Sequence, residues 1–139
     1  MHPYSFAVTL RINHPSCDPD RFTTELGMTP NRSWKAGDKR ITPKGTPLEG
    51  IYSDTYWYVW LTEEKINSKV MTLPDYLSSC LKKLERYEPL FNQVRAEGGR
   101  TMLYVFLYIK RNSGFELTHQ QISDFAKLGI SLGLDLYPE

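Results

Sequence analysis

Cysteine and histidine are scarce in this 139-residue chain, and the few copies are scattered. Cys17 and Cys80 form neither a Cys-x-x-Cys pair nor a zinc-ligand spacing, which predicts two reduced thiols. The three histidines, His2, His14 and His119, have no companion at the spacing that metal ligands need. The sequence therefore predicts no metal site.

The chain also lacks the short motifs that carry common enzyme chemistry. It contains no Gly-x-Ser-x-Gly, no His-Glu-x-x-His and no glycine-rich phosphate or dinucleotide loop. The adjacent acids Glu63 and Glu64 fall in a predicted loop, where surface charge is a better interpretation than an acid/base pair. We therefore expect a protein that is not an enzyme and needs no cofactor, while an unfamiliar chemistry stays open.

Long apolar runs and a strong charge of either sign are absent too. No run approaches the roughly 20 residues of a membrane span, and the first residues lack the basic and apolar regions of a signal peptide. We therefore expect a cytoplasmic protein without membrane contact. Seventeen basic and 16 acidic side chains give a net charge of +1. This balance argues against a chain that binds nucleic acid with its whole surface, but it leaves room for a basic patch.

What the chain has in quantity is alternation of apolar and polar residues, which is typical of half-buried strands. Capping-box patterns at Thr72 with Asp75 and at Thr118 with Gln121 begin two predicted helices, and Pro89 should interrupt the first of them. In chain order the patterns predict a strand over 5–13, a helix over 18–27, a loop-rich stretch over 29–55 with room for a short strand near 32–35, a strand over 56–62, a helical segment over 73–97, a strand over 103–109, a helix over 118–129 and a strand over 130–137.

This order predicts a single α+β domain over residues 1–139. Both ends of the chain show a strand, a helix that closes in Leu-Gly (Leu26-Gly27 and Leu128-Gly129), and a further extended segment. Two such β-α-β halves favour an antiparallel sheet of four to five strands, with the helices packed on one face and a ferredoxin-like topology.

The other face of the predicted sheet gathers aromatic side chains, because aromatic residues alternate with aliphatic ones in several strands. In the 56–62 strand nearly every position is apolar or aromatic, so either Tyr56, Tyr58 and Trp60 or the intervening residues could lie there. Asp135 projects from this face and could form an ion pair with Arg11. The candidate binding residues on the face are Arg11, Tyr58, Trp60, Tyr104, Phe106 and Tyr108.

Three fates are open for such a face. A partner protein or a second copy could cover it, since Tyr, Trp and Arg are enriched at interfaces. The face could instead stack unpaired bases, as open-faced sheets do in some RNA-binding domains. Alternatively, the 40–55 loop or the C-terminal end could fold over the rings and bury them within the domain.

A basic loop follows the first predicted helix. Residues 31–44 hold five basic residues against one acid, a local charge of +4, which could hold phosphate or an acidic protein surface. The charges could also be merely solvated, or Arg32 could make a cation–π contact with Trp34, which we expect to anchor the loop to the domain. The candidate binding residues of the loop are Arg32, Trp34, Lys35, Lys39 and Arg40.

Several stretches resemble one protein family when taken together. They are the loop over 26–38 (LGMTPNRSWKAGD), the strand around Trp57, the Gly-Phe-Glu-Leu of 114–117 and the closing 128–137 (LGISLGLDLY). This set is similar to a family of small bacterial proteins catalogued as domain of unknown function 4279, and the resemblance covers nearly the whole chain. It implies a single cytoplasmic α+β domain, and it transfers no catalytic residue and no ligand.

The sequence therefore predicts a non-catalytic binding protein that recognises another protein or a second copy of itself. By analogy with other small proteins that lack catalytic signatures, neutralisation of a cognate toxin or effector, as an immunity protein does, is one form of such binding. Two rival classes stay open. One is a single-stranded nucleic-acid binder that uses the aromatic face and the basic loop. The other is an enzyme or small-ligand binder with a pocket between the loop and the sheet.

Overall fold

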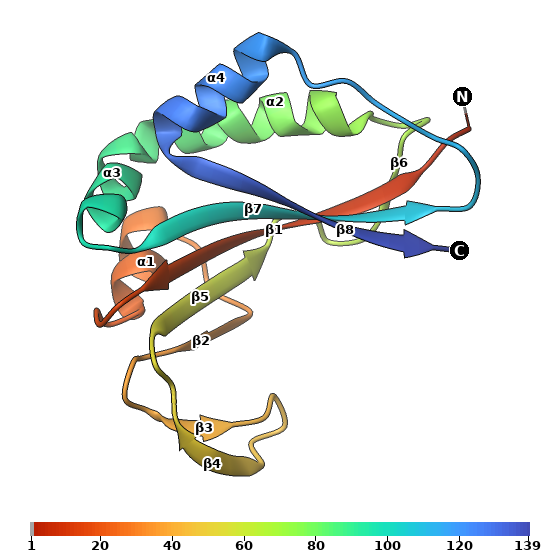
Figure 1. The fold of residues 1–139 in the computed structure, drawn as a ribbon. Helices are drawn as coiled ribbons and strands as arrows, with labels where there is room; N and C mark the ends of the chain where they lie inside the picture. Colours follow the sequence, from red (N-terminus) through yellow and green to blue (C-terminus); the bar gives the residue numbers. More distant parts are fainter. Residues whose placement is uncertain (1) are drawn as a thin grey trace.

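The computed structural model describes residues 2–139, and residue 1 lies outside the described part. A curved sheet carries helices on one side, and a small hairpin projects from one end of it (Figure 1). The elements in chain order are β1 (Ser5–His14), α1 (Asp20–Leu26), β2 (Arg32–Trp34), β3 (Lys39–Ile41), β4 (Pro47–Ile51), β5 (Thr55–Trp60), β6 (Ile66–Asn67), α2 (Leu73–Leu84), the 3-10 helix η1 (Glu85–Tyr87), α3 (Glu88–Ala96), β7 (Arg100–Ile109), α4 (His119–Leu128) and β8 (Ile130–Pro138).

The strands of the main sheet lie in the order β2-β5-β1-β7-β8, and the short β6 pairs with the start of β1. β1 is central and runs antiparallel to both β5 and β7. β7 and β8 run parallel, which corrects the prediction of a purely antiparallel sheet. The cause is α4, which carries the chain back across the sheet so that β8 starts at the same end as β7. The α+β class is as predicted, whereas this strand order does not confirm the ferredoxin-like topology.

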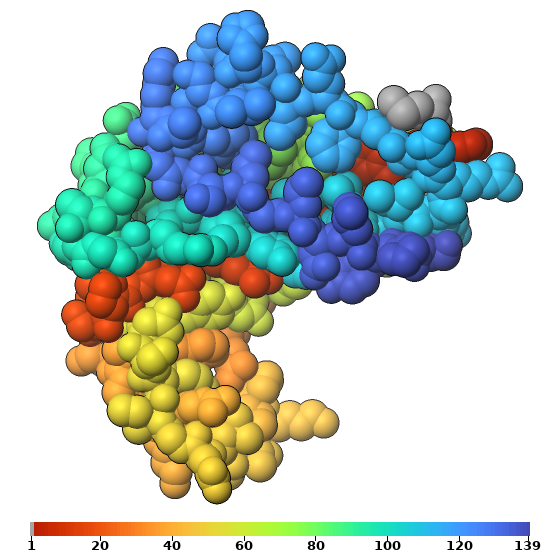
Figure 2. Space-filling model, in the orientation of Figure 1, coloured from red at the N-terminus to blue at the C-terminus, as the bar shows by residue number. Residues whose placement is uncertain are grey.

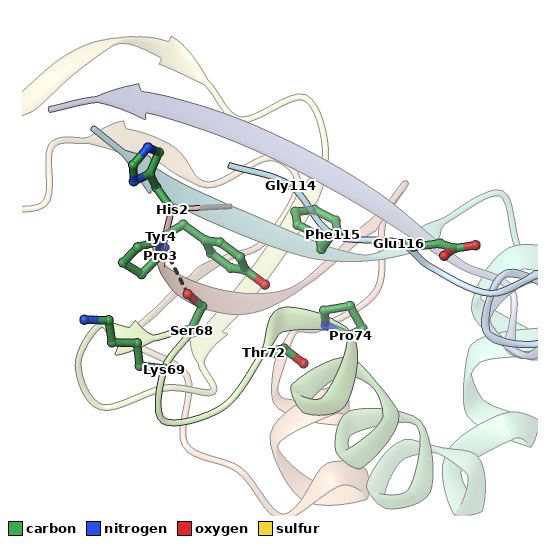
Figure 3. Close-up of a pocket in the computed structure, with 10 residues that line it drawn as sticks. All are labelled: His2, Pro3, Tyr4, Ser68, Lys69, Thr72, Pro74, Gly114, Phe115 and Glu116. Atoms are coloured by element: carbon green, nitrogen blue, oxygen red, sulfur yellow. Dashed lines mark hydrogen bonds between the residues drawn. The ribbon is translucent and has the colours of Figure 1, made fainter. Parts of the chain in front are cut away.

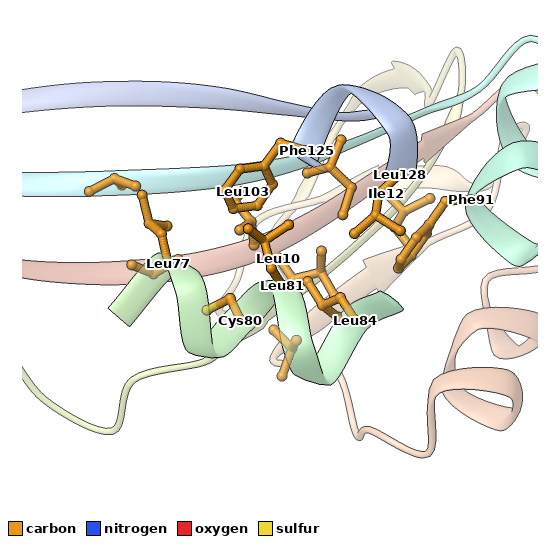
Figure 4. Packing of buried hydrophobic residues seen from close by; sticks show 14 of the residues in the cluster. Leu10, Ile12, Leu77, Cys80, Leu81, Leu84, Phe91, Leu103, Phe125 and Leu128 are labelled. Carbon is orange, nitrogen blue, oxygen red and sulfur yellow. The ribbon is translucent and has the colours of Figure 1, made fainter. Parts of the chain in front are cut away.

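The helices share one hydrophobic core with one face of the sheet. β1 points Phe6, Val8, Leu10 and Ile12 into that core, and none of the four is exposed to solvent. Figure 4 shows side chains of α2 and α4 packed over Leu10 and its neighbours. Each buried side chain of this size contributes about 1.5–3 kcal/mol relative to an exposed one. The predicted alternation of β1 therefore identifies the face that the helices cover.

Helix boundaries follow the signals in the sequence. α1 and α4 end at Gly27 and Gly129, whose φ angles of 66° and 70° lie in the left-handed region that favours glycine. Thr118 and Gln121 form the predicted capping box, in which each side chain accepts a hydrogen bond from the other's backbone N–H. Pro89 lies in the first turn of α3, directly after η1, so the predicted interruption gives two abutting helices.

A two-stranded hairpin, β3–β4, occupies the stretch that the sequence predicts as loop. It lies beyond β2 in Figure 1 and is separate from the main sheet. In the space-filling view of Figure 2 the hairpin and the C-terminal end of the chain lie on either side of a hollow. The hairpin thus lies beside the open face of the sheet at the end that carries the basic loop.

Candidate functional site

The open face of the sheet is the side that the helices leave uncovered. The orientation of β5 determines which of its aromatic side chains lie on that face. Trp57 and Val59 point into the core, and the Trp57 indole N–H donates to Thr23 Oγ1 at 3.0 Å. Tyr58 and Trp60 therefore lie on the open face. Tyr58 is paired in register with Arg11 of β1, and Trp60 and Tyr104 of β7 lie on either side of Thr9 of β1. The structure thus brings the six predicted face residues together.

Arg11 lies at the centre of these rings. Its guanidinium carbon is 4.3 Å from the centroid of the Tyr104 ring, 5.6 Å from that of Phe106 and 5.9 Å from that of Tyr58. Its Nε–H donates to Thr9 Oγ1 at 3.1 Å. Among residues 2–139 no carboxylate lies within ion-pair distance of Arg11. The predicted partner, Asp135, accepts a hydrogen bond from the Tyr137 hydroxyl at 2.9 Å instead, so the prediction of an Arg11–Asp135 pair is wrong.

The rings continue from Arg11 towards the C-terminal edge of the sheet. Phe106 lies 5.2 Å from Trp60 and 6.0 Å from Tyr137 between ring centroids, and Tyr137 lies 5.3 Å from Tyr108. Lys65 Nζ lies 3.6 Å from the Tyr108 centroid and 3.2 Å from the Glu139 carboxylate. We call this surface the aromatic face; it consists of Arg11, Tyr56, Tyr58, Trp60, Tyr104, Phe106, Tyr108 and Tyr137.

The basic loop contributes less free charge than the sequence predicts, because Arg32 is used to hold the hairpin. Its Nη2 donates to the Ile41 carbonyl at 2.7 Å and to the Tyr52 hydroxyl at 3.3 Å. Its guanidinium also lies 4.9 Å from the Trp34 ring, and Trp34 stacks on Tyr52 at 4.2 Å with an interplanar angle of 10°. Arg32 and Trp34 therefore fasten β3–β4 to β2, as expected for an anchoring tryptophan. Tyr52 is the partner that sequence reasoning missed.

The other basic residues of the loop differ in where they lie. Lys39 lines a cavity of about 350 Å³ together with Arg32 and Tyr58, so the loop and the aromatic face meet there. Lys35 and Arg40 are exposed and do not line this cavity, and Arg40 donates to the Glu49 carbonyl at 3.3 Å. Trp60 and Tyr137 remain 40% and 41% exposed, so the hairpin covers only one end of the aromatic face.

A second polar cluster, centred on His14, was not predicted. His14 Nδ1 accepts from the backbone N–H of Ser16 and Cys17 at 3.0 and 2.9 Å, which leaves Nε2–H to donate to Glu97 Oε1 at 2.8 Å. Arg21 donates to the same Glu97 oxygen at 2.7 Å. The bonds from Arg21 and His14 lower the pKa of Glu97. No sequence signal could have found this cluster, since 83 residues separate His14 from Glu97.

The His14 cluster resembles a catalytic arrangement but lacks a reactive nucleophile. Burial raises the pKa of the Cys17 thiol, whereas an activated cysteine needs a lowered one. His14 Nδ1 is occupied by two backbone donors and is not free to accept the thiol proton. The cluster therefore joins the loop after β1 to α1 and to the residue that follows α3.

A hollow beside the start of β1, shown in Figure 3, has a volume of about 430 Å³. Tyr4 lines it, but the Tyr4 hydroxyl accepts from the Leu73 N–H at 3.0 Å and the Tyr4 N–H donates to Ser68 Oγ at 3.0 Å. Phe115 and Glu116 of the Gly-Phe-Glu-Leu motif line the other wall. The polar groups of Tyr4 are therefore already used in hydrogen bonds within the chain. These bonds connect the start of β1 to the start of α2.

No group of three or more His, Cys, Asp or Glu residues within 2–139 could hold a metal ion. No helix of that range is long and apolar enough to cross a membrane.

Three comparisons with known proteins bear on identity. No curated protein and no solved structure matches the chain. The model of the family described as domain of unknown function (DUF4279) matches residues 2–139, and the chain therefore belongs to that family.

Proposed function

We propose that this chain is a non-catalytic binding protein that recognises another protein through its aromatic face. The observation that carries the proposal is Arg11, a half-buried cation framed by three rings with no carboxylate partner among residues 2–139. A guanidinium in such surroundings is fixed in place before binding and forms strong paired hydrogen bonds with a carboxylate. An acidic side chain of a partner protein would supply that carboxylate.

The rest of the face supports a protein partner. Trp60 and Tyr137 are large and partly exposed, and aromatic and Arg side chains carry much of the binding energy at protein interfaces. The hollow beside the face, visible in Figure 2, suits a protruding segment rather than a flat surface. Lys39 lines the cavity at the hairpin end, and Lys65 lies over Tyr108 at the opposite end. We therefore expect an acidic, protruding segment as the recognised element.

Binding of a single-stranded nucleic acid is the rival that the stacked rings favour. One feature weighs against it. Neighbouring rings of the face already pack against one another: Phe106 is tilted by 36° to Trp60 and by 52° to Tyr104, and Tyr137 stacks at 26° on Phe106 and at 17° on Tyr108. This packing leaves few free planes for bases.

We place this binding in the cytoplasm, where the two free thiols would stay reduced. A cognate toxin or effector is the kind of partner that we propose, by analogy with other small proteins without catalytic signatures. The partner that is captured in the experiment below decides this point.

The proposal is tested by capture from a lysate of the source cells, with the wild type and matched variants as bait. Arg11→Ala and Trp60→Ala should each weaken capture of one partner by about 30-fold, as expected for interface hot spots. Lys82→Ala, an exposed change on α2, is the matched control and should leave capture unchanged. Circular dichroism checks that each variant is folded.

Two results would contradict the proposal. One is a set of captured proteins that is the same for the wild type, Arg11→Ala and Trp60→Ala. The other is tight binding of a fluorescent single-stranded oligonucleotide that falls steeply with salt and is lost in Tyr104→Ala, which would favour the nucleic-acid rival.

A further inference from the structure

One edge of the main sheet is a long, unpaired, apolar strand. β8 has nine residues and pairs with β7 on one side, while no strand within residues 2–139 pairs with its other side. Leu134 and Leu136 are 54% and 59% exposed, although their neighbours in register on β7, Val105 and Leu107, are buried. Proteins usually blunt such an edge with charges, prolines or a covering loop. In β8 the one charge is Asp135 and the one proline is Pro138 at its end, and between Ile130 and Tyr137 the strand carries three leucines.

The apolar surface continues from β8 onto α4. Ile122 of α4 is 56% exposed, and at 100° per residue it shares a flank with the exposed Ala126. That flank lies opposite Asp124, which lines a crevice against α2. Figure 2 shows α4 and β8 side by side at the surface, with no other element across them. The free edge therefore has an apolar helix flank above it.

We propose that β8 pairs in antiparallel fashion with β8 of a second copy of this chain, about a two-fold axis near Gly133. This register sets Leu134 beside Leu132 of the second copy and Asp135 beside Ser131, so that apolar meets apolar and no like charges oppose. The two main sheets then form one continuous sheet. Leu134, Leu136 and Ile122 of each copy lie in the seam.

The dimensions of the edge fit a stable dimer. A nine-residue strand is roughly 30 Å long, and the strand with its overlying helix is roughly 20 Å deep, which gives about 600 Å² per protomer. A specific interface needs about 500 Å² per partner or more. A second copy would also cover the exposed apolar flank of α4. The α4 helix of the second copy would contact Ile122 and Ala126 of the first copy across the seam. An isolated peptide strand would leave that helix flank exposed.

Sedimentation velocity measures the proposed association. The protein concentration is varied over about 5–100 µM, a range that covers the dissociation constants of weak dimers. The wild type should sediment as a dimer of twice 16.1 kDa. Leu134→Lys should weaken the dimer by roughly 100-fold, because two exposed leucines per dimer lose their apolar contacts. Since Leu134 is more than half exposed in the single chain, the variant should remain folded.

Matched variants separate this edge from other modes of association. Val70→Lys changes an apolar side chain that is 84% exposed outside the seam, and it should leave the dimer intact. Arg11→Ala should also leave it intact, because Arg11 lies on β1 and β7 separates that strand from the β8 edge. Hydrogen exchange of the β8 amides should slow as the protein concentration rises.

A wild type that stays monomeric at about 100 µM would have a dissociation constant above the range of stable dimers. That result would overturn the proposal. A dimer that Leu134→Lys leaves unchanged, or that Arg11→Ala disrupts, would overturn it too. If the wild type is monomeric and Leu134→Lys abolishes capture of another protein, the edge serves a different partner.

Discussion

At the scale of single residues, Gly133 decides how Tyr104 lies on the aromatic face. A Cβ atom at Gly133 would fall 2.6 Å from the Tyr104 ring and 3.2 Å from Met102 Sδ. The ring would have to move, and with it the stacking of Tyr104 on Arg11 at 4.3 Å. The missing side chain in β8 is therefore part of the arrangement that holds the central cation.

Gly133→Ala should destabilise the protein by about 1–3 kcal/mol, because the added methyl group overpacks against Tyr104. Urea unfolding measures this cost. In a Tyr104→Ala background the same change should cost much less, since the clashing ring is gone, so the double-mutant cycle should show clear coupling. Equal costs in both backgrounds would show that the Tyr104 ring is not what Gly133 accommodates.

Single residues also show how far sequence reasoning reaches. Alternation placed Arg11, Tyr104 and Phe106 on one face, because β1 and β7 have aliphatic residues at every second position. It could not orient β5, whose residues are aromatic or apolar on both faces. It also paired Arg11 with Asp135, whereas the neighbouring Tyr137 hydroxyl binds that carboxylate. Alternation assigns a side chain to a face but not to a partner on it.

At the scale of elements, the β3–β4 hairpin is fastened to β2 through Tyr52, which contacts Arg32 and Trp34. The Tyr52 hydroxyl donates to the Ile41 carbonyl at 2.8 Å and accepts from the Ile41 N–H at 3.2 Å and from Arg32 at 3.3 Å. The sequence did not predict this hairpin, because Pro43, Gly45, Pro47 and Gly50 lie within it and are typical of loops. A contact made by Tyr52, outside both strands, stabilises it.

Tyr52→Phe should loosen the hairpin and leave the rest of the domain unchanged. The variant keeps the stacking on Trp34 but loses the three hydroxyl hydrogen bonds, so the amides of β3 and β4 should exchange about five- to tenfold faster. Hydrogen exchange by mass spectrometry measures this, with Lys44→Ala at the hairpin tip as the control. Faster exchange throughout β1 and β7 would mean that Tyr52 supports the whole sheet.

The ion pair at the end of α3 makes stability depend on pH. Arg21 and His14 lower the pKa of Glu97 in the folded protein below its ordinary value of about 4.3. The stabilisation is therefore present above that value and is lost as the pH falls through the lower folded-state pKa. Glu97→Gln removes the titrating group. The wild type should therefore be more stable than the variant at about pH 7, well above 4.3, and this difference in stability should shrink in acid.

Thermal unfolding followed by circular dichroism across the acid range checks this gap. Glu63→Gln, in an exposed loop, is the matched control and should follow the wild type at every pH. A gap between the wild type and Glu97→Gln that stays constant as the pH falls would show that the Glu97 carboxylate is not responsible.

At the scale of the whole molecule, the chain divides its surface into a helical side and an aromatic side with one core between them. That division follows from alternation in β1 and β7 and from the amphipathic helices, and it was predictable. The long-range ties were not. His14 reaches Glu97 across 83 residues, and the parallel β7–β8 pair depends on which end of the sheet the chain reaches after α4. Both are set by packing of distant segments, which local patterns do not encode.

The two thiols report on how this single core opens. Cys80 is 4% exposed in α2, and burial raises its pKa to about 11. At about pH 8, three units below that pKa, only about one thousandth of the thiol is ionised. Because all of the helices share one core with the sheet, Cys80 should become reactive only when the whole domain unfolds. In Cys17→Ser, which leaves Cys80 as the single thiol, labelling should therefore give the same free energy of unfolding as urea denaturation. Labelling that is fast in the native protein and insensitive to urea would instead mean that α2 separates from the sheet on its own.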